Sequence, residues 1–234
     1  MSIIFKEETH QYFNTENNRE YLSGTKFLHL FEPPFDKYGI SKRVALKEGK
    51  TQQQVLDEWD AISKQACEYG TATHLLMENY IKFGEINNEY PSLYDTFNEC
   101  VGKTYQVAEA IHSEVLLWID EYEIAGQADL IIDHPNNEFS VGDFKTNKKI
   151  EFYSAYGNRM LPPVDHLSQC QHNLYALQLS LYAYMYSLRT GRKLRHIFLM
   201  HCNNRSDGWK YIPCNAMLHE IKFMLHFYKE KMKK

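Results

Sequence analysis

Two short apolar runs joined by a polar turn constrain the fold of this chain more than any other feature. The stretch ADLIIDHPNNEFSVGDFK places β-branched and aromatic residues on both sides of a Pro-Asn-Asn segment, which predicts an antiparallel hairpin. With a loop from His134 to Glu138, Asp129 lies directly opposite Asp143. Because side chains two apart in a strand share a face, Lys145 is expected on the same side as both aspartates.

The facing aspartates need a compensating charge. Directly opposed strand positions have Cβ atoms about 4.5 to 5.5 Å apart, and like charges there are destabilising. A divalent cation such as Mg²⁺ or Mn²⁺ would offset the repulsion, since these ions prefer oxygen ligands. Protonation of one aspartate, neutralisation by Lys145 alone, or a register shifted by one residue are alternatives that the hairpin itself leaves open.

The order of elements along the chain predicts an α/β (α+β) fold, with a central mixed sheet flanked by helices. We expect a β-meander over about residues 3–22, helix over about 40–83 with a break near Gly70 where Thr71 caps a second helix, and a further helix over about 93–110. After the hairpin, apolar residues recur at helical spacing from Leu167 to Leu188, and Gly191 marks the stop. RHIFLMHC and GWKYI predict two strands, and a last helix is expected from Asn215.

The composition predicts one folded, intracellular domain. The 234 residues are 44% hydrophobic, enough to bury a sizeable core. The five cysteines are scattered and form no C-x-x-C pair, so neither a disulfide framework nor a cysteine metal site is indicated. No run approaches the roughly 20 apolar residues that span a bilayer. The net charge of -4 is not the usual basic footprint of a nucleic-acid binder, although a carboxylate-rich metal site would itself make such a protein more acidic.

Four motifs, in order, resemble those of the PD-(D/E)XK nuclease superfamily, and within it the RecB-type and phage-type exonucleases. The resemblance spans about residues 10–202 and implies a restriction-endonuclease-like domain. Residues 1–69 would form the N-terminal meander and helices, 70–202 the catalytic core and 203–234 a C-terminal strand and helix. The family's proline is absent, and without a four-cysteine cage no iron-sulfur cluster is expected. The motifs are GTATH with MENY (His74, Glu78), AGQADLII (Asp129), GDFKT (Asp143, Lys145) and the Q-x-x-x-Y match YALQLSLYAY (Gln178, Tyr182).

The resemblance also implies roles for these residues. Lys145 would orient or help deprotonate an attacking water and stabilise charge on the phosphate. Gln178 and Tyr182, expected beside the apolar stripe of their helix, would contact the DNA backbone or orient Lys145; an overlapping match, QHNLY (Gln171, Tyr175), fits the family less well. One or two Mg²⁺ or Mn²⁺ ions would be held by His74, Asp129, Asp143 and the Phe144 backbone carbonyl, with Glu78 and Glu114 as further candidates. Thr146, Asn147 and Lys148 are candidate DNA contacts.

These expectations combine into a metal-dependent deoxyribonuclease, most similar to a phage or prophage exonuclease acting in recombination, replication or repair. An endonuclease of the same fold and a catalytically inactive DNA-binding accessory subunit are the alternatives. The expected partners are DNA and a single-strand annealing or recombination protein, with no membrane, in the cytoplasm of a bacterium or a phage-infected host. The motifs do not distinguish single-stranded from double-stranded substrates.

Overall fold

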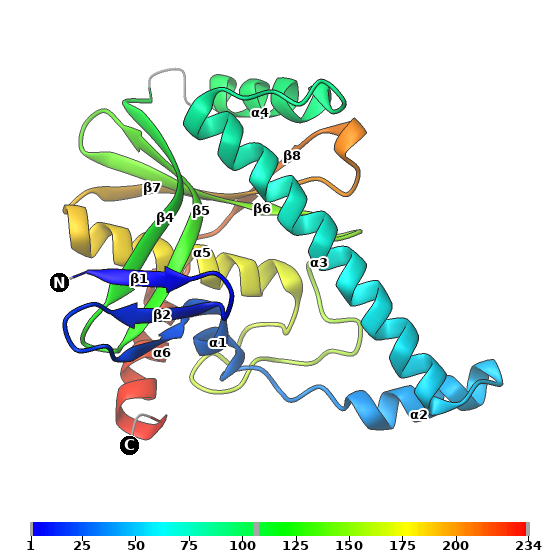
Figure 1. The fold of residues 1–234 in the computed structure, drawn as a ribbon. Coiled ribbons are helices and arrows are strands. Elements are labelled where there is room, and N and C mark those ends of the chain that lie inside the picture. Colours follow the sequence, from blue (N-terminus) through cyan, green and yellow to red (C-terminus); the bar gives the residue numbers. More distant parts are fainter. Residues whose placement is uncertain (1, 105–107, 233–234) are drawn as a thin grey trace.

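An eight-stranded mixed sheet forms the centre of the molecule (Figure 1). The computed structural model describes residues 2–104 and 108–232. The strands follow the order β1-β2-β3-β5-β6-β7-β8, and β4 pairs with β5. This confirms the predicted α/β class and the N-terminal meander. The strands are β1 (Ile3–Lys6), β2 (Gln11–Asn14), β3 (Glu20–Ser23), β4 (Ala110–Ile119), β5 (Ile124–His134), β6 (Glu138–Lys145), β7 (Lys193–His201) and β8 (Lys210–Cys214).

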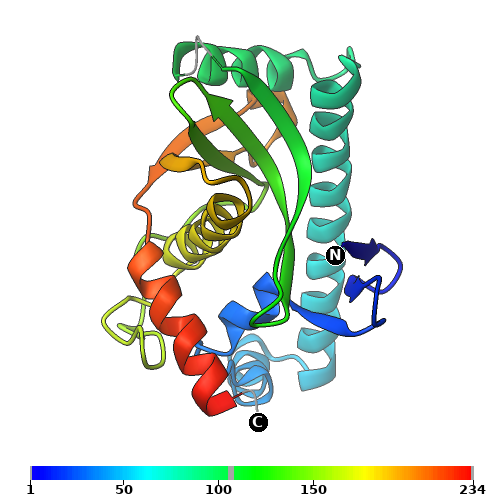
Figure 2. The same cartoon turned by 90° about the vertical axis from the view of Figure 1, so that its left-hand side faces the viewer.

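Helices cover both faces of the sheet. Figure 2 shows α3 on one side of β4 and β5, and α5 and α6 on the other. No helix in the described part of the chain is long and apolar enough to cross a membrane. The helices are α1 (Gly24–His29), α2 (Lys37–Glu48), α3 (Gln52–Phe83), α4 (Pro91–Thr104), α5 (Gln171–Thr190) and α6 (Leu218–Phe227), with a 3₁₀ turn at Arg205–Asp207 and a π-helical turn at Tyr228–Met232.

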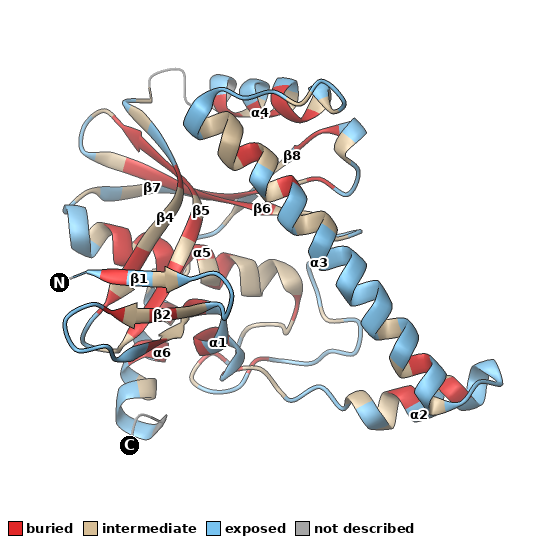
Figure 3. Cartoon of the chain, in the orientation of Figure 1, coloured by how far each residue is buried: buried red, intermediate tan, exposed pale blue. Residues whose placement is uncertain are grey.

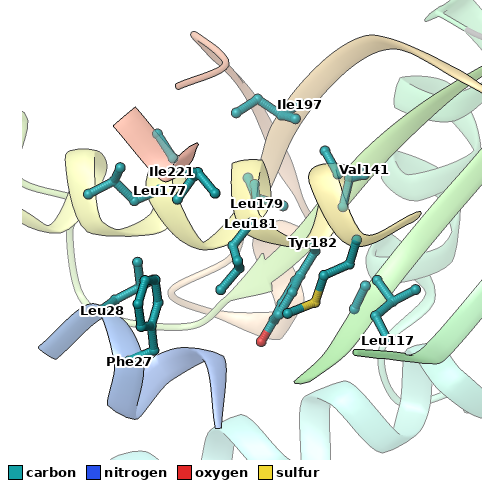
Figure 4. Close-up of a cluster of buried hydrophobic side chains, with 14 of the residues drawn as sticks. Phe27, Leu28, Leu117, Val141, Leu177, Leu179, Leu181, Tyr182, Ile197 and Ile221 are labelled. Carbon is teal, nitrogen blue, oxygen red and sulfur yellow. The ribbon is translucent and has the colours of Figure 1, made fainter. Parts of the chain in front are cut away.

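Alternation along the strands divides the apolar residues between two cores. Ile131 belongs to the cluster under α1, α5 and α6, whereas its neighbours Leu130 and Ile132 belong to the cluster under α3 and α4. Successive strand side chains point to opposite faces, so a strand covered on both sides is apolar throughout. Figure 4 shows the first of these cores, in which Leu177 and Leu181 of α5 lie among side chains from α1, α6 and the sheet.

The predicted break at Gly70 is wrong, because α3 continues through it from Gln52 to Phe83. The interruption lies twenty residues earlier. Gly49 ends α2 in the left-handed region at φ 66°, and Thr51 begins α3 with a capping box that involves Gln54. Gly70 is instead a packing position. A Cβ there would lie 3.2 Å from Thr146 Oγ1, so the glycine allows α3 to approach the end of β6.

Other boundaries differ by a few residues. The hairpin strands reach His134 and Glu138, which pair with each other, so the loop is shorter than expected. The helix expected over 93–110 ends at Thr104, β4 begins at Ala110, and residues 105–107 lie outside the described part. Leu167 precedes α5, which begins at Gln171, and α6 begins at Leu218 instead of residue 215.

One edge of β5 is shared by two strands, and this creates a fork in the sheet. Leu22 and Ser23 of β3 pair in parallel with Ile124 and Ala125, at the start of β5. The last residues of β5, from Leu130 onward, pair with β6. Between these two ladders, residues 126–129 pair with neither β3 nor β6 on this edge, because β3 has turned into α1 and β6 diverges along β7 (Figure 1).

Candidate active site

The two aspartates of the hairpin lie at this fork. The observed register pairs Asp133 with Phe139 and Leu130 with Gly142, as the sequence predicted, and the next step along it places Asp129 opposite Asp143. Asp129 remains in the site despite the nearby negative charge. Its Oδ2 accepts a hydrogen bond of 2.8 Å from the backbone N–H of Phe144, so the carboxylate is held across the point where the strands separate.

Glu114 of β4 adds a third carboxylate to the row. On the other edge of β5, Ser113 pairs with Leu130 and Val115 with Ala128, which leaves Glu114 opposite Asp129. Glu114 has φ 54°, in the left-handed region that non-glycine residues rarely adopt. This local distortion of the strand coincides with the position where Glu114 joins the acidic row.

A histidine from the covering helix completes this group. His74 Nδ1, on α3, lies 3.4 Å from Asp129 Oδ2. One ligand atom from each of His74, Glu114 and Asp129 lies within 4.8 Å of the other two. The ring of Phe144 packs edge-on against the imidazole, with centroids 5.9 Å apart. The adjacent strands β4 and β5 and the distant helix α3 therefore converge on one small volume.

The electrostatics of the row disfavour a full set of negative charges in the metal-free protein. Burial, then the nearby charges of Asp129 and Glu78, raise the pKa of Glu114 from 4.5 to about 8. Burial likewise raises the pKa of Asp143 from 3.8 to about 6, against the opposing effect of Lys145. Each carboxyl would ionise more readily if a cation shared the site.

Lys145 pairs with Asp143 and is covered by an aromatic ring. Its Nζ lies 2.5 Å from Asp143 Oδ2, and the side chain is 17% exposed. The same ammonium lies 4.6 Å from the ring centroid of Tyr175, on α5. Burial alone would lower the pKa of Lys145, but the carboxylates of Asp143 and Asp129 outweigh it and raise the pKa. Lys145 is therefore a cation in a fixed position.

The α5 residues differ from the expectation. Tyr182 does not lie beside the apolar stripe: it is 4% exposed and belongs to the core. A Cβ at Gly126 would lie 2.4 Å from the Tyr182 ring, and one at Gly24 would lie 3.2 Å from it, so this ring fills the space where β3 leaves β5 and turns into α1. Gln178 Nε2 donates to Tyr182 Oη at 3.3 Å. The aromatic contact of Lys145 comes from Tyr175, in the overlapping motif that fits the family less well.

The residues after β6 are divided between internal bonds and the surface. Asn147 Nδ2 donates to the carbonyl of Lys149 at 2.6 Å and to Gln171 Oε1 at 3.2 Å, so its amide nitrogen orders the loop. Thr146 faces Gly70 of α3, and Lys148 is exposed. Of the three candidate DNA contacts, Lys148 is exposed, whereas Thr146 and Asn147 are partly buried.

Glu78 and the two strand glycines also have protein neighbours. Glu78 Oε1 lies 2.5 Å from Lys82 Nζ, one turn along α3, so a lysine contact accounts for this carboxylate. Protein fills the space beside the strand glycines Gly126 and Gly142: a Cβ at Gly142 would lie 2.6 Å from the Phe198 ring, and one at Gly126 would meet the Tyr182 ring.

Sequence reasoning underrated one neighbour of the acids and missed another. Glu114 was only a further candidate, because no sequence motif indicates its φ or the strand with which β4 pairs. Tyr12 of β2 was not considered: burial, followed by the charges of Glu114 and Asp129, raises its pKa to about 12. The signal that could have indicated Tyr12 is its place in the meander that precedes the core motifs, and this does not single it out from the other aromatic residues there.

The donor set fits a divalent cation. Two carboxylates and an imidazole within 4.8 Å suit Mn²⁺, and the oxygens suit Mg²⁺ as well. A bound cation would also offset the burial and the neighbouring negative charges that raise the pKa of Glu114. Asp143 lies outside this three-residue group, and its Oδ2 contacts the Lys145 ammonium.

Comparisons with known proteins give remote structural likenesses. No family model matches the chain, and no curated protein matches it. Among solved structures, a candidate exonuclease from Eubacterium rectale has a TM-score of 0.43 at 12% identity, over 97% of this chain and 85% of that one. The protein SSO0001 has a TM-score of 0.36 at 14% identity, over 91% of this chain and 74% of that one. At these TM-scores neither likeness carries a conclusion about function.

Proposed function

We propose that this protein is a metal-dependent deoxyribonuclease that hydrolyses phosphodiester bonds. The observation that supports it is the row of Glu114, Asp129 and Asp143 across three adjacent strands, with His74 beside its first two members and Lys145 beside the last. A cation site next to a fixed ammonium is the combination that phosphoryl chemistry needs, because negative charge develops on the phosphate oxygens. The resemblance of the D-x-K-T and G-T-x-x-H motifs to those of PD-(D/E)XK nucleases supports the same reaction.

Mg²⁺ or Mn²⁺ would be held by His74, Glu114 and Asp129. Asp143 and the Phe144 carbonyl are proposed as additional ligands, and a second ion would need them. When bound, the ion supplies Lewis-acid polarisation of the phosphate and a lower pKa for a coordinated water. His74 is positioned for this by α3 and by the ring of Phe144, and Asp129 by its bond from the Phe144 N–H.

Lys145 supplies a positive charge at the other end of the row. Since its pKa is raised, the side chain is an ammonium that donates hydrogen bonds and does not accept a proton. An ammonium can stabilise the phosphate and orient a water, so these roles fit Lys145 better than removing the proton of that water. Asp143 and Tyr175 hold the ammonium in place from two sides.

Incubation of the purified protein with linear and covalently closed DNA, with Mn²⁺, Mg²⁺ or EDTA, tests the proposal. Glu114→Gln and Lys145→Ala should each lower the rate by at least about 100-fold, whereas Lys64→Ala, an exposed lysine of α3, should not. Cleavage that survives EDTA, or full activity in both site variants, would refute the mechanism. Because Lys145→Ala also leaves Asp143 unpaired, the folded state of each variant is checked by its melting temperature.

The same assay separates the finer alternatives. We propose an exonuclease of the phage or prophage type, which would degrade linear DNA and leave the closed circle intact. Cutting of the circle would assign an endonuclease of the same fold. Binding of DNA without any cleavage would assign an accessory subunit, with a role in recombination, replication or repair beside a single-strand annealing or recombination protein. A cytoplasmic location belongs to the same proposal.

A further inference from the structure

The segment that follows the site exposes an unusual set of aromatic rings. We call Glu151–Arg159 the aromatic loop. Within it Phe152, Tyr153 and Tyr156 are 47%, 81% and 90% exposed. Single exposed apolar side chains are common on protein surfaces, but a local group of large ones marks a binding surface. Loops that carry such groups on a rigid scaffold are frequent ligand sites.

The aromatic loop is held in one conformation by its own contacts. Ser154 N donates to Ser168 Oγ at 2.9 Å, and Ser154 Oγ accepts from the N–H of Asn158 at 3.0 Å. The ring of Phe152 stacks on His172 of α5, with centroids 4.6 Å apart and planes at 29°. Tyr153 and Tyr156 therefore stand on a fixed turn, so little conformational entropy is lost when a ligand packs against them.

The loop is joined to the candidate active site through the first turn of α5. Gln171 Oε1 accepts from Asn147 Nδ2 at 3.2 Å and from the N–H of Glu151 at 3.1 Å, and His172 N donates to the Glu151 carbonyl at 3.0 Å. Tyr175, which covers Lys145, lies four residues after Gln171, a rise of about 6 Å along the helix. The loop and the ring that covers Lys145 are therefore held by neighbouring turns of α5.

The surroundings of the loop are basic although the protein is acidic. Residues 145–159 contain four lysine and arginine residues against one glutamate, in a chain of net charge -4. Lys148 and Lys149 are exposed. Phe35, in the linker before α2, and Tyr38, in the first turn of α2, contribute further exposed rings, at 69% and 71%.

This linker is anchored beside the same loop. Leu161 N donates to the carbonyl of Phe31 at 2.7 Å, which ties the chain after the aromatic loop to the chain before Phe35. Residues 26–50 contain six lysine and arginine residues against three acidic ones. Beyond the linker, residues 60–68 of α3 are exposed on every side, so α2 and this half of α3 project from the body (Figure 3). Two basic, aromatic segments therefore meet at one junction.

We propose that the aromatic loop binds a single-stranded nucleic acid next to the active site, with bases stacked on Tyr153 and Tyr156 and phosphates at Lys148 and Lys149. Unpaired bases offer both faces to aromatic rings, whereas a duplex hides them, and phosphates match the local positive charge. This inference deepens the proposed function and rests on it for the choice of DNA as the ligand. It assigns the substrate as single-stranded or frayed at the end that enters the site.

Binding is measured in EDTA, where the proposed cleavage cannot occur, by fluorescence anisotropy of a labelled dT12 and of a blunt duplex. The Tyr153→Ala/Tyr156→Ala pair should weaken dT12 binding at least tenfold. The Phe pair at the same positions should stay within about twofold of wild type, because the rings remain. The Leu pair, which keeps apolar area without a π face, should behave like the Ala pair. Phe83→Ala, an exposed ring at the far end of α3, is the matched control.

The outcomes separate this inference from the proposed function. Tyrosine-dependent binding of dT12 by a protein that never cleaves DNA supports the inference while the nuclease proposal fails. Cleavage with unchanged dT12 affinity in the Ala pair overturns the inference alone, as would be seen if the rings contact another protein. No dT12 binding by wild type, or an equal loss for dT12 and duplex, also overturns it. Comparing the affinities for dT12 and rU12 distinguishes DNA from RNA as the ligand. Tighter binding of either oligonucleotide supports the stacking site.

Discussion

Glu114→Gln should make the metal-free protein more stable, although it removes a residue of the site. The unfolded chain ionises this carboxyl with a pKa of 4.5, whereas the folded protein raises the pKa to about 8. At pH 7 folding therefore takes up a proton. This lowers the free energy of unfolding by about 1.36 kcal/mol for each pH unit above 4.5, or about 3 kcal/mol in total. A neutral amide carries no such cost. At about 2 to 4 °C per kcal/mol, the melting temperature should rise by about 6 to 12 °C.

The assay is thermal unfolding at pH 7, in EDTA and in Mn²⁺. Wild type should gain about 2.7 kcal/mol when Mn²⁺ reaches 100 times its dissociation constant. The variant has lost a metal ligand and should gain less stability from Mn²⁺. The difference in stability between the two proteins should therefore narrow or reverse when the metal is added. Glu121→Gln, a control at an exposed residue beyond the end of β4, removes a surface pair with Lys229 and should change stability by under about 1 kcal/mol in both buffers.

Two results would refute this reasoning. A variant less stable than wild type in EDTA would mean that the folded protein does not disfavour the Glu114 carboxylate. An equal Mn²⁺ shift in both proteins would mean that Glu114 does not hold the ion. The absence of any Mn²⁺ shift in wild type would remove the metal from the proposed mechanism, and the stability difference in EDTA would still report on the buried charge.

Three further predictions concern the same fork. Lys145→Met leaves Asp143, which is 3% exposed, without its cation, and should lower the free energy of unfolding in urea by about 3 to 5 kcal/mol. Adding Asp143→Leu should restore at least half of that loss. An unchanged stability in the single variant would contradict the pairing. Gly126→Ala places a Cβ 2.4 Å from the Tyr182 ring and should cost about 1 to 3 kcal/mol. That cost should shrink in a Tyr182→Leu background, and additive effects in the double-mutant cycle would argue against the contact. In EDTA, stability should fall as the pH rises from about 4 to 8, because the folded pKa of both Glu114 and Asp143 lies above the unfolded value. Melting at several pH values, with a flatter profile for Glu114→Gln, is the check; a wild-type profile as flat as that of the variant would contradict it.

The hairpin register could be predicted because the sequence specifies it twice. Alternation assigns one side of each strand to each core, and the short polar turn fixes which residues face each other. A slip of one residue would move every apolar side chain to the other face, so Ile131 and Leu130 would exchange cores. The opposition of Asp129 and Asp143 follows from this register, and so does the position of Lys145.

The role of Glu114 could not be predicted in the same way. It lies on β4, which forms a hairpin with β5 through residues 120–123, but the ladder is irregular at this position: the pairs Ser113–Leu130 and Val115–Ala128 flank a residue in the left-handed region. Its left-handed φ is a response to the surrounding sheet and not a preference of glutamate. A carboxylate that seemed peripheral in the sequence therefore shares a ligand group with His74 and Asp129.

The two tyrosines of α5 show where helical periodicity loses its power. Tyr175 and Tyr182 are seven residues apart, close to two full turns, so both lie on one face and both follow a glutamine by four residues. Their positions along the helix decide which residues they contact. Tyr182 lies under β5 and fills the space at Gly126, whereas Tyr175 lies at the open end of the fork beside Lys145.

The sequence by itself determined the fold class, the hairpin and the register that places Asp129 opposite Asp143, because these depend on local periodicity and a short turn. The tertiary structure alone decided that β5 divides one edge between β3 and β6, that α3 continues through Gly70, and that Glu114 joins the acidic row. The first two depend on packing between segments far apart in the chain, and the third on a local distortion of β4 within the folded sheet. Their free energies come from packing and charge in the folded state, which no stretch of residues carries on its own.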